Sequence, residues 1–304
     1  HADNNFKQSK QQCYTWPVAG FWNWGGIVDR ERRLDRIVSK ISPRDVNGSE
    51  IYKSELIYNV ISFIPACDFV DNSILISNLG YLLSQQRLNT CIVDFKVFYP
   101  NLYQYLNVKP NKKSKGLIML LKNDKTDFRE EILPTKYEHL YLLSPSPQDL
   151  IEEYFDFSLD QIDRVIDNLK HMFDIVLIDV PNNPPLEFCL SAMKCCHLGF
   201  FNASEKVDTV SNVMKLLSFA ASIGISTAKL TNIVFTETLG INYDYKVFKE
   251  NGFKIVAALP FVKAAHTNPL EGKLYVKDNP VMDKHYIKNI NILVSLLTGK
   301  NKGD

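Results

Sequence analysis

The sequence lacks the features of membrane-spanning, disulfide-rich and strongly charged proteins. Its 304 residues contain neither a signal peptide nor an apolar run long enough to cross a membrane. The six cysteines are scattered, which favours reduced thiols over a disulfide framework. Lys and Arg (35) nearly balance Asp and Glu (34), so no net field demands nucleic acid or an anionic membrane as a partner. We therefore expect an ordinary globular protein of a reducing, cytoplasmic compartment.

Four neighbouring residues raise a metal-site hypothesis, namely Cys189, Cys195, Cys196 and His197. Adjacent cysteines in a helix do not easily share one tetrahedral site, and no second Cys/His pair lies nearby in the sequence. We interpret the cysteines as small buried hydrophobic residues and expect no metal site.

The first strand-to-helix turn is poor in the residues that bind phosphate. The apolar run Tyr58–Ile64 predicts a strand, and the segment from Ser73 to Leu83 predicts a helix. Such a turn cradles phosphates when it contains glycines that let backbone N–H groups converge, a lysine, and a Ser or Thr for Mg²⁺. Between this strand and this helix there is neither glycine nor lysine. The turn therefore lacks the usual means of holding a triphosphate.

Strands and helices alternate along most of the chain. Segments of helical periodicity separate the short β-rich runs, and one of them begins with the capping-box pattern Ser158–Gln161. Continuous apolar strands joined by helical crossovers predict a doubly wound, mostly parallel sheet with helices on both faces. We place this α/β domain at residues 56–304. The predicted strands are Tyr58–Ile64, Thr90–Asp94, Tyr141–Leu143, Ile175–Val180, Leu198–Phe201, Ile233–Phe235 and Ile255–Leu259.

Residues 1–55 differ from the rest and contain all three tryptophans. We expect an N-terminal extension here, or the end of an upstream domain. Trp22 and Trp24 are candidate partner contacts, because tryptophan anchors concentrate binding energy at interfaces. A second surface candidate is a basic patch, for which a solvated loop and a DNA contact are both open interpretations. It consists of Lys109, Lys112, Lys113 and Lys115.

The order of these segments and several short motifs resemble the MinD/ParA-type P-loop ATPases (the SIMIBI class). Counted without gaps back from Asn78-Leu79-Gly80-Tyr81, the family's K-G-G-x-G-K-T-T turn falls on residues 67–74. In this alignment the two lysine positions hold Cys67 and Asn72, the three glycine positions hold Asp68, Phe69 and Asp71, and Ser73 keeps the metal-side hydroxyl.

These replacements disfavour binding of a triphosphate. Asp68 and Asp71 place carboxylates where phosphate oxygens would lie, at about 4 kcal/mol for each like-charge contact near 4 Å at an effective dielectric of about 20. Phe69 restricts the positive-φ turn that glycine tolerates. The resemblance therefore implies a P-loop ATPase fold with a degenerate Walker A motif, and we do not favour ATP or Mg²⁺ as a cofactor.

Further landmarks of the family lie on later strands. Phe173–Pro181 resembles the Walker B pattern F-D-Y-V-I-I-D-x-P, in which Asp179 would act on Mg²⁺ through water. Asp94 keeps the first Asp of the family's D-x-D-x-x-x-x-N-L segment, but Lys96 replaces the second, which orients the attacking water in active members. Thr236 replaces an Asn that contacts adenine. These departures argue further against hydrolysis.

Two finer interpretations concern single segments. Lys96 has the hypothetical role of pairing with Asp68 or Asp71 and so neutralising an empty pocket. The segment Leu140–Leu150 resembles the L-P-A-P-x-x-P-x-D-L segment of the CpaE/TadZ branch, which is tied to placing pilus or secretion machinery. The apolar face of residues 286–297 is expected to pack on the sheet as its last helix rather than to insert into a membrane.

The resemblance implies a scaffold that dimerises and recruits or positions a protein machine, such as a pilus, secretion or partition complex. With its nucleotide residues altered, we expect a non-catalytic pseudo-ATPase that forms a constitutive homodimer. We expect it in the cytoplasm, with recruitment to a membrane-associated or polar complex as an option. Two alternatives stay open, namely an atypical Mg·ATP-binding ATPase that uses Ser73, Asp94 and Asp179, and a partition-like protein that binds DNA.

Overall fold

The computed structural model describes residues 58–68, 70–110, 116–241 and 243–299. In this part of the chain, no helix is long and apolar enough to cross a membrane. Several residues singled out in the sequence lie outside the described residues, so the roles given to them stay predictions. They are Trp22, Trp24, Phe69, Lys112, Lys113 and Lys115.

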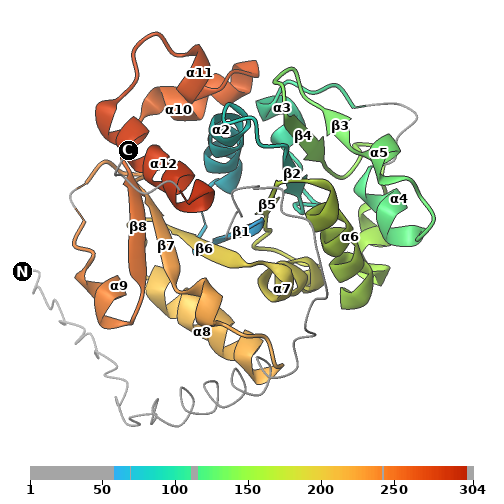
Figure 1. Cartoon of the computed structure of the whole chain (residues 1–304). Helices are drawn as coiled ribbons and strands as arrows, with labels where there is room; N and C mark the ends of the chain where they lie inside the picture. Colours follow the sequence, from blue (N-terminus) through green and yellow to red (C-terminus); the bar gives the residue numbers. More distant parts are fainter. Residues whose placement is uncertain (1–57, 69, 111–115, 242, 300–304) are drawn as a thin grey trace, which may run out of the picture. The chain divides into compact units, whose positions relative to one another are not determined.

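An eight-stranded sheet forms the centre of the domain (Figure 1). Its order is β3-β4-β2-β5-β1-β6-β7-β8, and every neighbouring pair is parallel except β3 with β4. The strands β2, β5 and β6 are buried along their whole length, as expected when helices cover both faces of a parallel sheet. The predicted fold class is confirmed. The strands are β1 (Val60–Pro65), β2 (Thr90–Asp94), β3 (Leu133–Pro134), β4 (Leu140–Leu143), β5 (Ile175–Asp179), β6 (Leu198–Ala203), β7 (Asn232–Thr236) and β8 (Lys254–Leu259).

All seven predicted strands are present, and β3 is the addition. It pairs antiparallel with β4 at one edge of the sheet, where Leu133 lies opposite Leu142. Two residues carry no periodic pattern, so the sequence gives no signal for this strand. It lies at the far edge from the central strands and does not contribute to the site described below.

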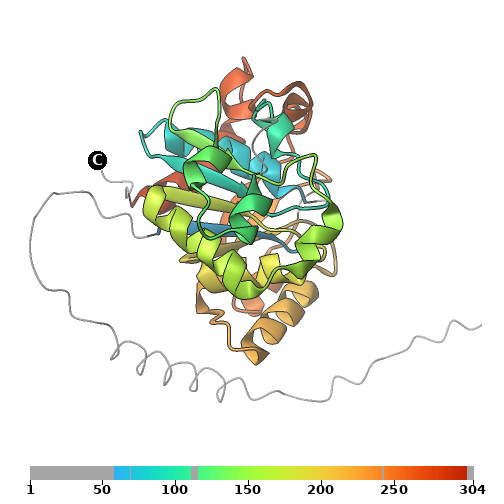
Figure 2. The same cartoon turned by 90° about the vertical axis from the view of Figure 1, so that its right-hand side faces the viewer.

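Helices cover the two faces of the sheet as separate layers (Figure 2). Along β5, Val176 joins the core under α6, α7 and α8, whereas its neighbour Leu177 joins the core under α2 and α12. The helices are α2 (Asn72–Ser84), α3 (Leu102–Tyr105), α4 (Leu117–Lys122), α5 (Phe128–Glu131), α6 (Leu159–Met172), α7 (Leu186–Cys195), α8 (Thr209–Ser222), α9 (Lys246–Glu250), α10 (Lys263–Thr267), α11 (Tyr275–Asp278) and α12 (Lys284–Thr298), with the 3₁₀ turns η1 (Ile151–Asp156), η2 (Ala228–Leu230) and η3 (Asn268–Glu271).

Helix α2 approaches the sheet closely because it contains a glycine on its inner face. A Cβ added at Gly80 would lie 2.8 Å from Cδ1 of Ile92 on β2, so a larger residue would require the side chains of β2 or the helix to shift. Asp71 caps the N-terminus of this helix. The first residues of α2 are thereby held at the carboxyl ends of the central strands.

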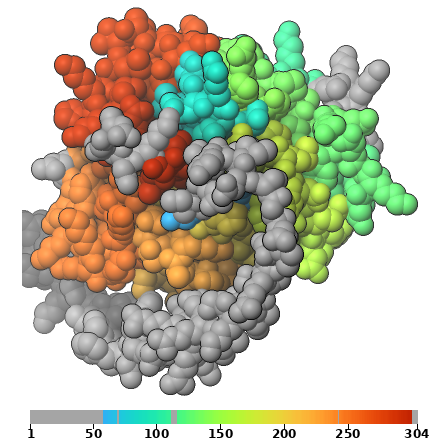
Figure 3. Space-filling model, in the orientation of Figure 1, coloured from blue at the N-terminus to red at the C-terminus, as the bar shows by residue number. Residues whose placement is uncertain are grey.

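Two helices show features that the sequence predicted, namely the packing of one and the N-terminal cap of the other. Helix α12 buries Tyr286, Ile290 and Leu293, and it lies beside α2 on the face shown in the space-filling view (Figure 3). It is the last helix of the described chain and packs on β8, as the sequence predicted. At the start of α6, the backbone N–H of Ser158 donates to Oε1 of Gln161 at 3.0 Å, which is one half of the predicted capping box.

Candidate functional site

The candidate site lies at the carboxyl ends of the central strands, where the strand order changes direction. From β1 the sheet extends through β5 to β2 on one side and through β6 to β7 on the other. Open α/β sheets bind their ligands at such a switch point. Asp94 ends β2, Asp179 ends β5, and the two residues are register partners in the parallel pair. The sheet itself therefore brings two fully buried carboxyl groups together.

Asp71 occupies the N-terminus of α2, where a phosphate loop would hold an anion. Its side chain accepts a hydrogen bond from the N–H of Ser73 at 2.9 Å, and the hydroxyl of Tyr105 donates to its Oδ2 at 2.7 Å. Burial by itself raises the pKa of Asp71, but the nearby Lys96 and these hydrogen bonds outweigh burial and lower it. A carboxylate of the chain thus binds at the positive end of the helix.

Lys96 is the centre of the site. Its Nζ lies 3.0 Å from Oδ2 of Asp179 and 3.5 Å from Oδ1 of Asp71, and it donates to Oδ1 of Asn101 at 2.9 Å. It also contacts the hydroxyl of Ser73, which hydrogen-bonds to Asp179. The resemblance to P-loop ATPases assigns Ser73 and Asp179 to the metal, so the ammonium group lies where Mg²⁺ would be expected. We call Lys96, these four partners and Asp94, whose charge also interacts with Lys96, the Lys96 cluster.

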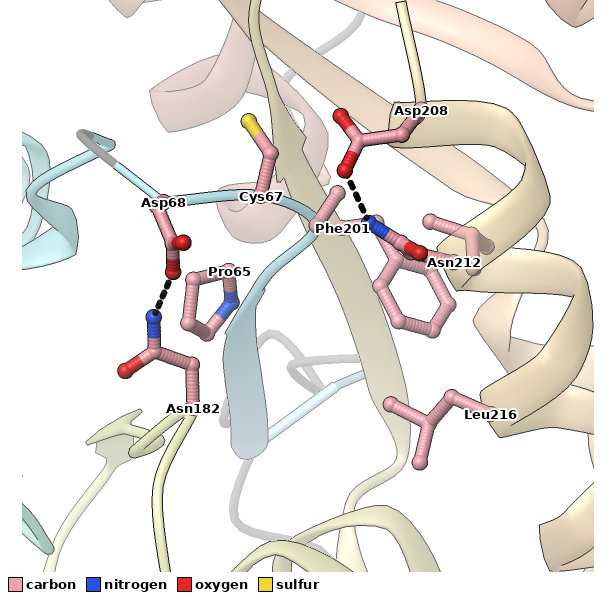
Figure 4. A pocket seen from close by; sticks show the side chains of 10 residues that line it. Pro65, Cys67, Asp68, Asn182, Phe201, Asp208, Asn212 and Leu216 are labelled. Atoms are coloured by element: carbon pink, nitrogen blue, oxygen red, sulfur yellow. Dashed lines mark hydrogen bonds between the residues drawn. The ribbon is translucent and has the colours of Figure 1, made fainter. Parts of the chain in front are cut away.

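The hypothesis that Lys96 pairs with Asp68 or Asp71 is confirmed, and its partner in the turn is Asp71. The chain directs Asp68 toward the segment after β5, where its Oδ1 accepts a hydrogen bond from Nδ2 of Asn182 at 3.4 Å (Figure 4). Asp68 is exposed, whereas the strongest partner of Lys96, Asp179, is buried. The internal cation therefore compensates the buried carboxylates rather than the solvated one.

Burial and charge shift the pKa values of this cluster. Burial raises the pKa of Asp94 to about 7, with Lys96 lowering it and Asp179 raising it. The pKa of Asp179 is also raised by burial, against the opposing effect of Lys96. The pKa of Lys96 is lowered by burial but raised more strongly by the three carboxylates around it. The lysine therefore stays charged, while Asp94 exchanges its proton near neutral pH.

A neutral hydrogen-bond chain connects two other altered positions, and we call it the Asn202 relay. The hydroxyl of Thr236 on β7 donates to Oδ1 of Asn202 on β6 at 2.8 Å. Nδ2 of Asn202 donates to Oδ1 of Asn72 at 2.9 Å, and Nδ2 of Asn72 donates to the carbonyl of Phe63 at 2.8 Å. The positions that the resemblance assigns to a phosphate-binding lysine and an adenine-binding Asn are thus hydrogen-bonded through one buried amide.

Little space remains at the site. The cavity bounded by Asp71, Lys96 and Asp179 has a volume of about 200 Å³, below the roughly 300–1,000 Å³ of typical small-molecule sites. A second cavity of about 230 Å³ lies beside it, between the end of β1 and the start of α8 (Figure 4). Cys67 lies at the wall of this second cavity, with its Sγ 3.2 Å from the hydroxyl of Ser204. Cys67 is therefore not part of the Lys96 cluster.

Three residues complete the site although the sequence did not single them out. Asn101 carries a signal, because it is the Asn of the D-x-D-x-x-x-x-N-L segment that begins at Asp94. Asn202 is a polar residue directly after an apolar run, and polar side chains at strand ends are candidates for a ligand site. Tyr105 carries no signal, since its contact with Asp71 depends on how α3 packs.

Other residues considered in the sequence lie apart from this site. Cys189 and Cys196 are buried, and burial raises the pKa of both thiols. Nδ1 of His197 accepts a hydrogen bond from the N–H of Val60 at 3.2 Å, at the opposite end of β1. Of the predicted basic patch, the structure describes Lys109, which is exposed.

Comparison with solved structures identifies the fold. MinD from Pyrococcus horikoshii, complexed with Mg-ADP, matches with a TM-score of 0.66 at 19% identity over 80% of this chain and 99% of that chain. This chain has the fold of the MinD/ParA-type P-loop ATPases. A ParA family ATPase from Chlorobium tepidum matches with a TM-score of 0.65 at 15% identity, over 77% of this chain and 97% of that chain. The MinC:MinD complex of Aquifex aeolicus matches with a TM-score of 0.63 at 14% identity, over 80% and 97%.

No protein-family model matches the sequence, and no curated protein matches it either. The likeness to MinD and ParA structures therefore rests on the sheet order and the helix layers, at identities of 14 to 19%. The Lys96 cluster and the Asn202 relay lie at the carboxyl ends of the strands, where open α/β sheets bind their ligands. These two groups of residues are thus the part of the chain from which function is to be inferred.

Proposed function

We propose that this protein is a pseudo-ATPase, a MinD/ParA-like scaffold that binds proteins and does not hydrolyse ATP. The observation that carries this proposal is the position of Lys96, whose ammonium group lies between Ser73 and Asp179. In an active site of this fold, those two side chains would serve a divalent cation. Here a cation of the chain itself holds both.

The residues present do not fit Mg²⁺. For the metal to bind, the ammonium group must leave, because a unit charge and a divalent cation about 4 Å apart repel by roughly 8 kcal/mol at an effective dielectric of about 20. Leaving also breaks the ion pair that Lys96 makes with the buried Asp179. A metal site built on Ser73, Asp94 and Asp179 would therefore have to displace this internal cation before it could form.

The residues present do not fit a triphosphate either. The helix N-terminus that would bind phosphate already holds the carboxylate of Asp71. An incoming phosphate would meet this carboxylate at close range and would find neither lysine nor glycine in the turn. The remaining cavity of about 200 Å³ is also smaller than typical small-molecule sites. This is the basis for regarding the Walker A motif as degenerate.

The scaffold role is supported by apolar side chains exposed beyond the strand ends. Val207 after β6, Leu239 and Ile241 after β7, and Phe261 after β8 are all exposed to solvent. Exposed apolar residues gathered on one face are typical of protein–protein interaction sites. We propose that this face forms a homodimer that does not depend on nucleotide and recruits or positions a protein machine in the cytoplasm or at a membrane-associated complex.

A closer relation to the CpaE/TadZ branch is a finer proposal, supported by the segment Leu140–Leu150. After β4 this segment forms a turn in which the N–H of Ser146 donates to Oδ2 of Asp149 at 2.8 Å. The hydroxyl of Tyr154 also donates to Asp149. The Asp of the branch motif therefore has a structural role here, and the pilus or secretion machinery of that branch is the partner class we propose.

Calorimetry with Mg·ATP tests the absence of nucleotide chemistry. We expect no binding tighter than about 1 mM, which corresponds to about −4 kcal/mol. The variant Lys96→Asp removes the internal cation and serves as the comparison, with Lys122→Asp as the control on an exposed lysine. Micromolar binding by the unaltered chain, accompanied by hydrolysis, would support the ATPase that uses Ser73, Asp94 and Asp179 instead.

Light scattering tests the dimer. We expect the mass of two chains at tens of micromolar protein, unchanged by Mg·ATP or by a chelator. Replacement of Val207 and Leu239 by Asp should give a monomer, because each change places a charge in the proposed apolar contact. A monomer formed by the unaltered chain would refute the constitutive dimer.

A further inference from the structure

The second cavity has both polar and apolar residues in its lining, and the proposed scaffold function assigns no role to it. Its walls include the apolar side chains of Pro65, Phe201 and Leu216. Asp68 and Asp208 lie on opposite sides of it, one from the loop after β1 and the other from the start of α8 (Figure 4). The cavity thus has a mainly polar lining that includes two carboxylates, with apolar side chains beside them.

Each of these carboxylates is held by one amide. Oδ1 of Asp68 accepts from Nδ2 of Asn182 at 3.4 Å, and Oδ2 of Asp208 accepts from Nδ2 of Asn212 at 3.0 Å. Within the described residues, no salt bridge joins either carboxylate to Lys or Arg. The amides fix the orientation of the two carboxylates and leave one oxygen of each available to a further donor.

The surrounding charge is the reverse of that in a phosphate site. Asp71, Asp94 and Asp179 share the single ammonium group of Lys96, and Asp68 and Asp208 add two more carboxylates beside them. A cleft lined by one sign of charge raises the local concentration of ligands of the opposite sign. The strand ends of this chain therefore attract a cation.

The size of the cavity indicates what kind of cation. A volume of about 230 Å³ is smaller than the roughly 300–1,000 Å³ of drug-sized ligand sites. A long basic side chain fits the lining, because its apolar stem packs on Pro65 and Leu216 while its charged head reaches a carboxylate. Arginine matches better than lysine, since its planar guanidinium group presents several donors to carboxylates on two sides.

We propose that this cavity receives an arginine side chain of a protein partner. Pro65 at the end of β1 and Leu216 of α8 supply the apolar part of its wall. Arginine anchors in pockets surrounded by apolar residues are typical centres of protein interfaces. The proposal rests on the scaffold function in that the occupant belongs to a protein, and it adds the residue by which that partner is recognised.

The test is an NMR titration of the full chain labelled with ¹⁵N-asparagine, using Nα-acetyl-arginine N-methylamide as the probe. The side-chain amide signals of Asn182 and Asn212 are assigned with Asn182→Gln and Asn212→Gln. We expect both signals to shift in a saturable manner. Nα-acetyl-citrulline N-methylamide has nearly the same shape without the charge, and it should leave the signals in place.

Paired variants test whether the two carboxylates recognise the positive charge of the arginine probe. Asp68→Asn with Asp208→Asn should weaken binding of the probe about tenfold, because the ion pairs are lost while the shape is kept. The matched control, Asp156→Asn with Asp160→Asn, changes two exposed carboxylates on η1 and α6 and should have no effect. A second readout is the amide spectrum of each variant, which shows that the fold is intact.

Three results would overturn the proposal. They are an equal response to the citrulline probe, unchanged binding by the variant of Asp68 and Asp208, and tighter binding of free putrescine than of the arginine probe. The last result would assign the cavity to a small amine instead. Failure of this titration can be distinguished from failure of the proposed function. The titration contains no nucleotide and tests the second cavity, whereas the Mg·ATP calorimetry tests the Lys96 cluster.

Discussion

The Lys96 cluster and the Asn202 relay lie on two sides of one site and are held together by different forces. The cluster joins a cation to buried carboxylates, so its strength depends on charge and on protonation. The relay joins two amides, a hydroxyl and a carbonyl, none of which titrates. The chain thus occupies these strand ends with its own side chains in two ways. The strength of the cluster depends on pH, whereas the strength of the relay does not.

Removing the cation should have the largest effect. Lys96→Met leaves Asp71 and Asp179 without their positive partner and should lower the free energy of unfolding by about 3–5 kcal/mol, as for other buried pairs that lose one member. Denaturation by urea measures this change. The matched control is Lys122→Met, which breaks an exposed pair with Glu153 and should cost about 1 kcal/mol or less. Equal losses in the two variants would remove the distinction between the cluster and an ordinary surface pair.

Breaking the relay should have an intermediate effect. Asn202→Leu removes the acceptor of Thr236 and the donor of Asn72, and each buried polar group without a partner costs about 1–3 kcal/mol. We expect a total loss near 3 kcal/mol in the same urea experiment. Asn168→Leu changes an exposed asparagine of α6 and should stay within about 0.5 kcal/mol. A loss no greater than that of the control would show that the relay does not stabilise the fold.

The third expected effect is a difference in pH dependence, which is measured as a slope rather than as a loss at one pH. Because burial raises the pKa of Asp94 to about 7, the folded state binds more protons than the unfolded state between about pH 4 and 7. Stability therefore falls as the pH rises through this window, by up to about 1.4 kcal/mol per pH unit for one proton. Below the window the Asp94 carboxyl is protonated in both states and contributes no slope.

Asp94→Asn should flatten this slope between pH 5 and about 7, whereas Asn202→Leu should leave it unchanged. Urea denaturation at a series of pH values measures both slopes. If the relay variant changes the slope as much as Asp94→Asn does, then the two sides of the site are not electrostatically distinct. The three experiments together rank the cluster above the relay and separate their causes.

The sequence predicted the framework well because the framework depends on local patterns. Continuous apolar runs at Ile175–Val180 and Leu198–Phe201 belong to strands buried on both faces, and the structure places β5 and β6 there. The two-residue strand Leu133–Pro134 has no pattern and was missed. Within the site, the sequence singled out Lys96 because it replaces a family carboxylate in a recognisable segment.

The contacts inside the site depend on side chains from separate strands and helices meeting in space, which local sequence patterns do not specify. Asp179 as the main partner of Lys96 follows from the register of β2 with β5, and a shift of one residue would turn it to the other face. The same holds for Asn202, whose amide reaches both α2 and β7 only because β6 lies between β1 and β7. The sequence left open whether Lys96 pairs with Asp68 or Asp71 for a related reason, since the path of a turn without glycine is not set by its composition.

The ammonium group of Lys96 is attached to the chain two residues after Asp94, and this tether has a consequence for timing. A tethered group has an effective concentration at its site of millimolar or more, and no change in the surrounding solution dilutes it. Under the proposed function, a chelator would remove nothing from this position, and a fall in the energy charge of the cell would not empty it. The scaffold would therefore have no nucleotide-driven cycle of its own, and the supply of its partners would determine when it assembles.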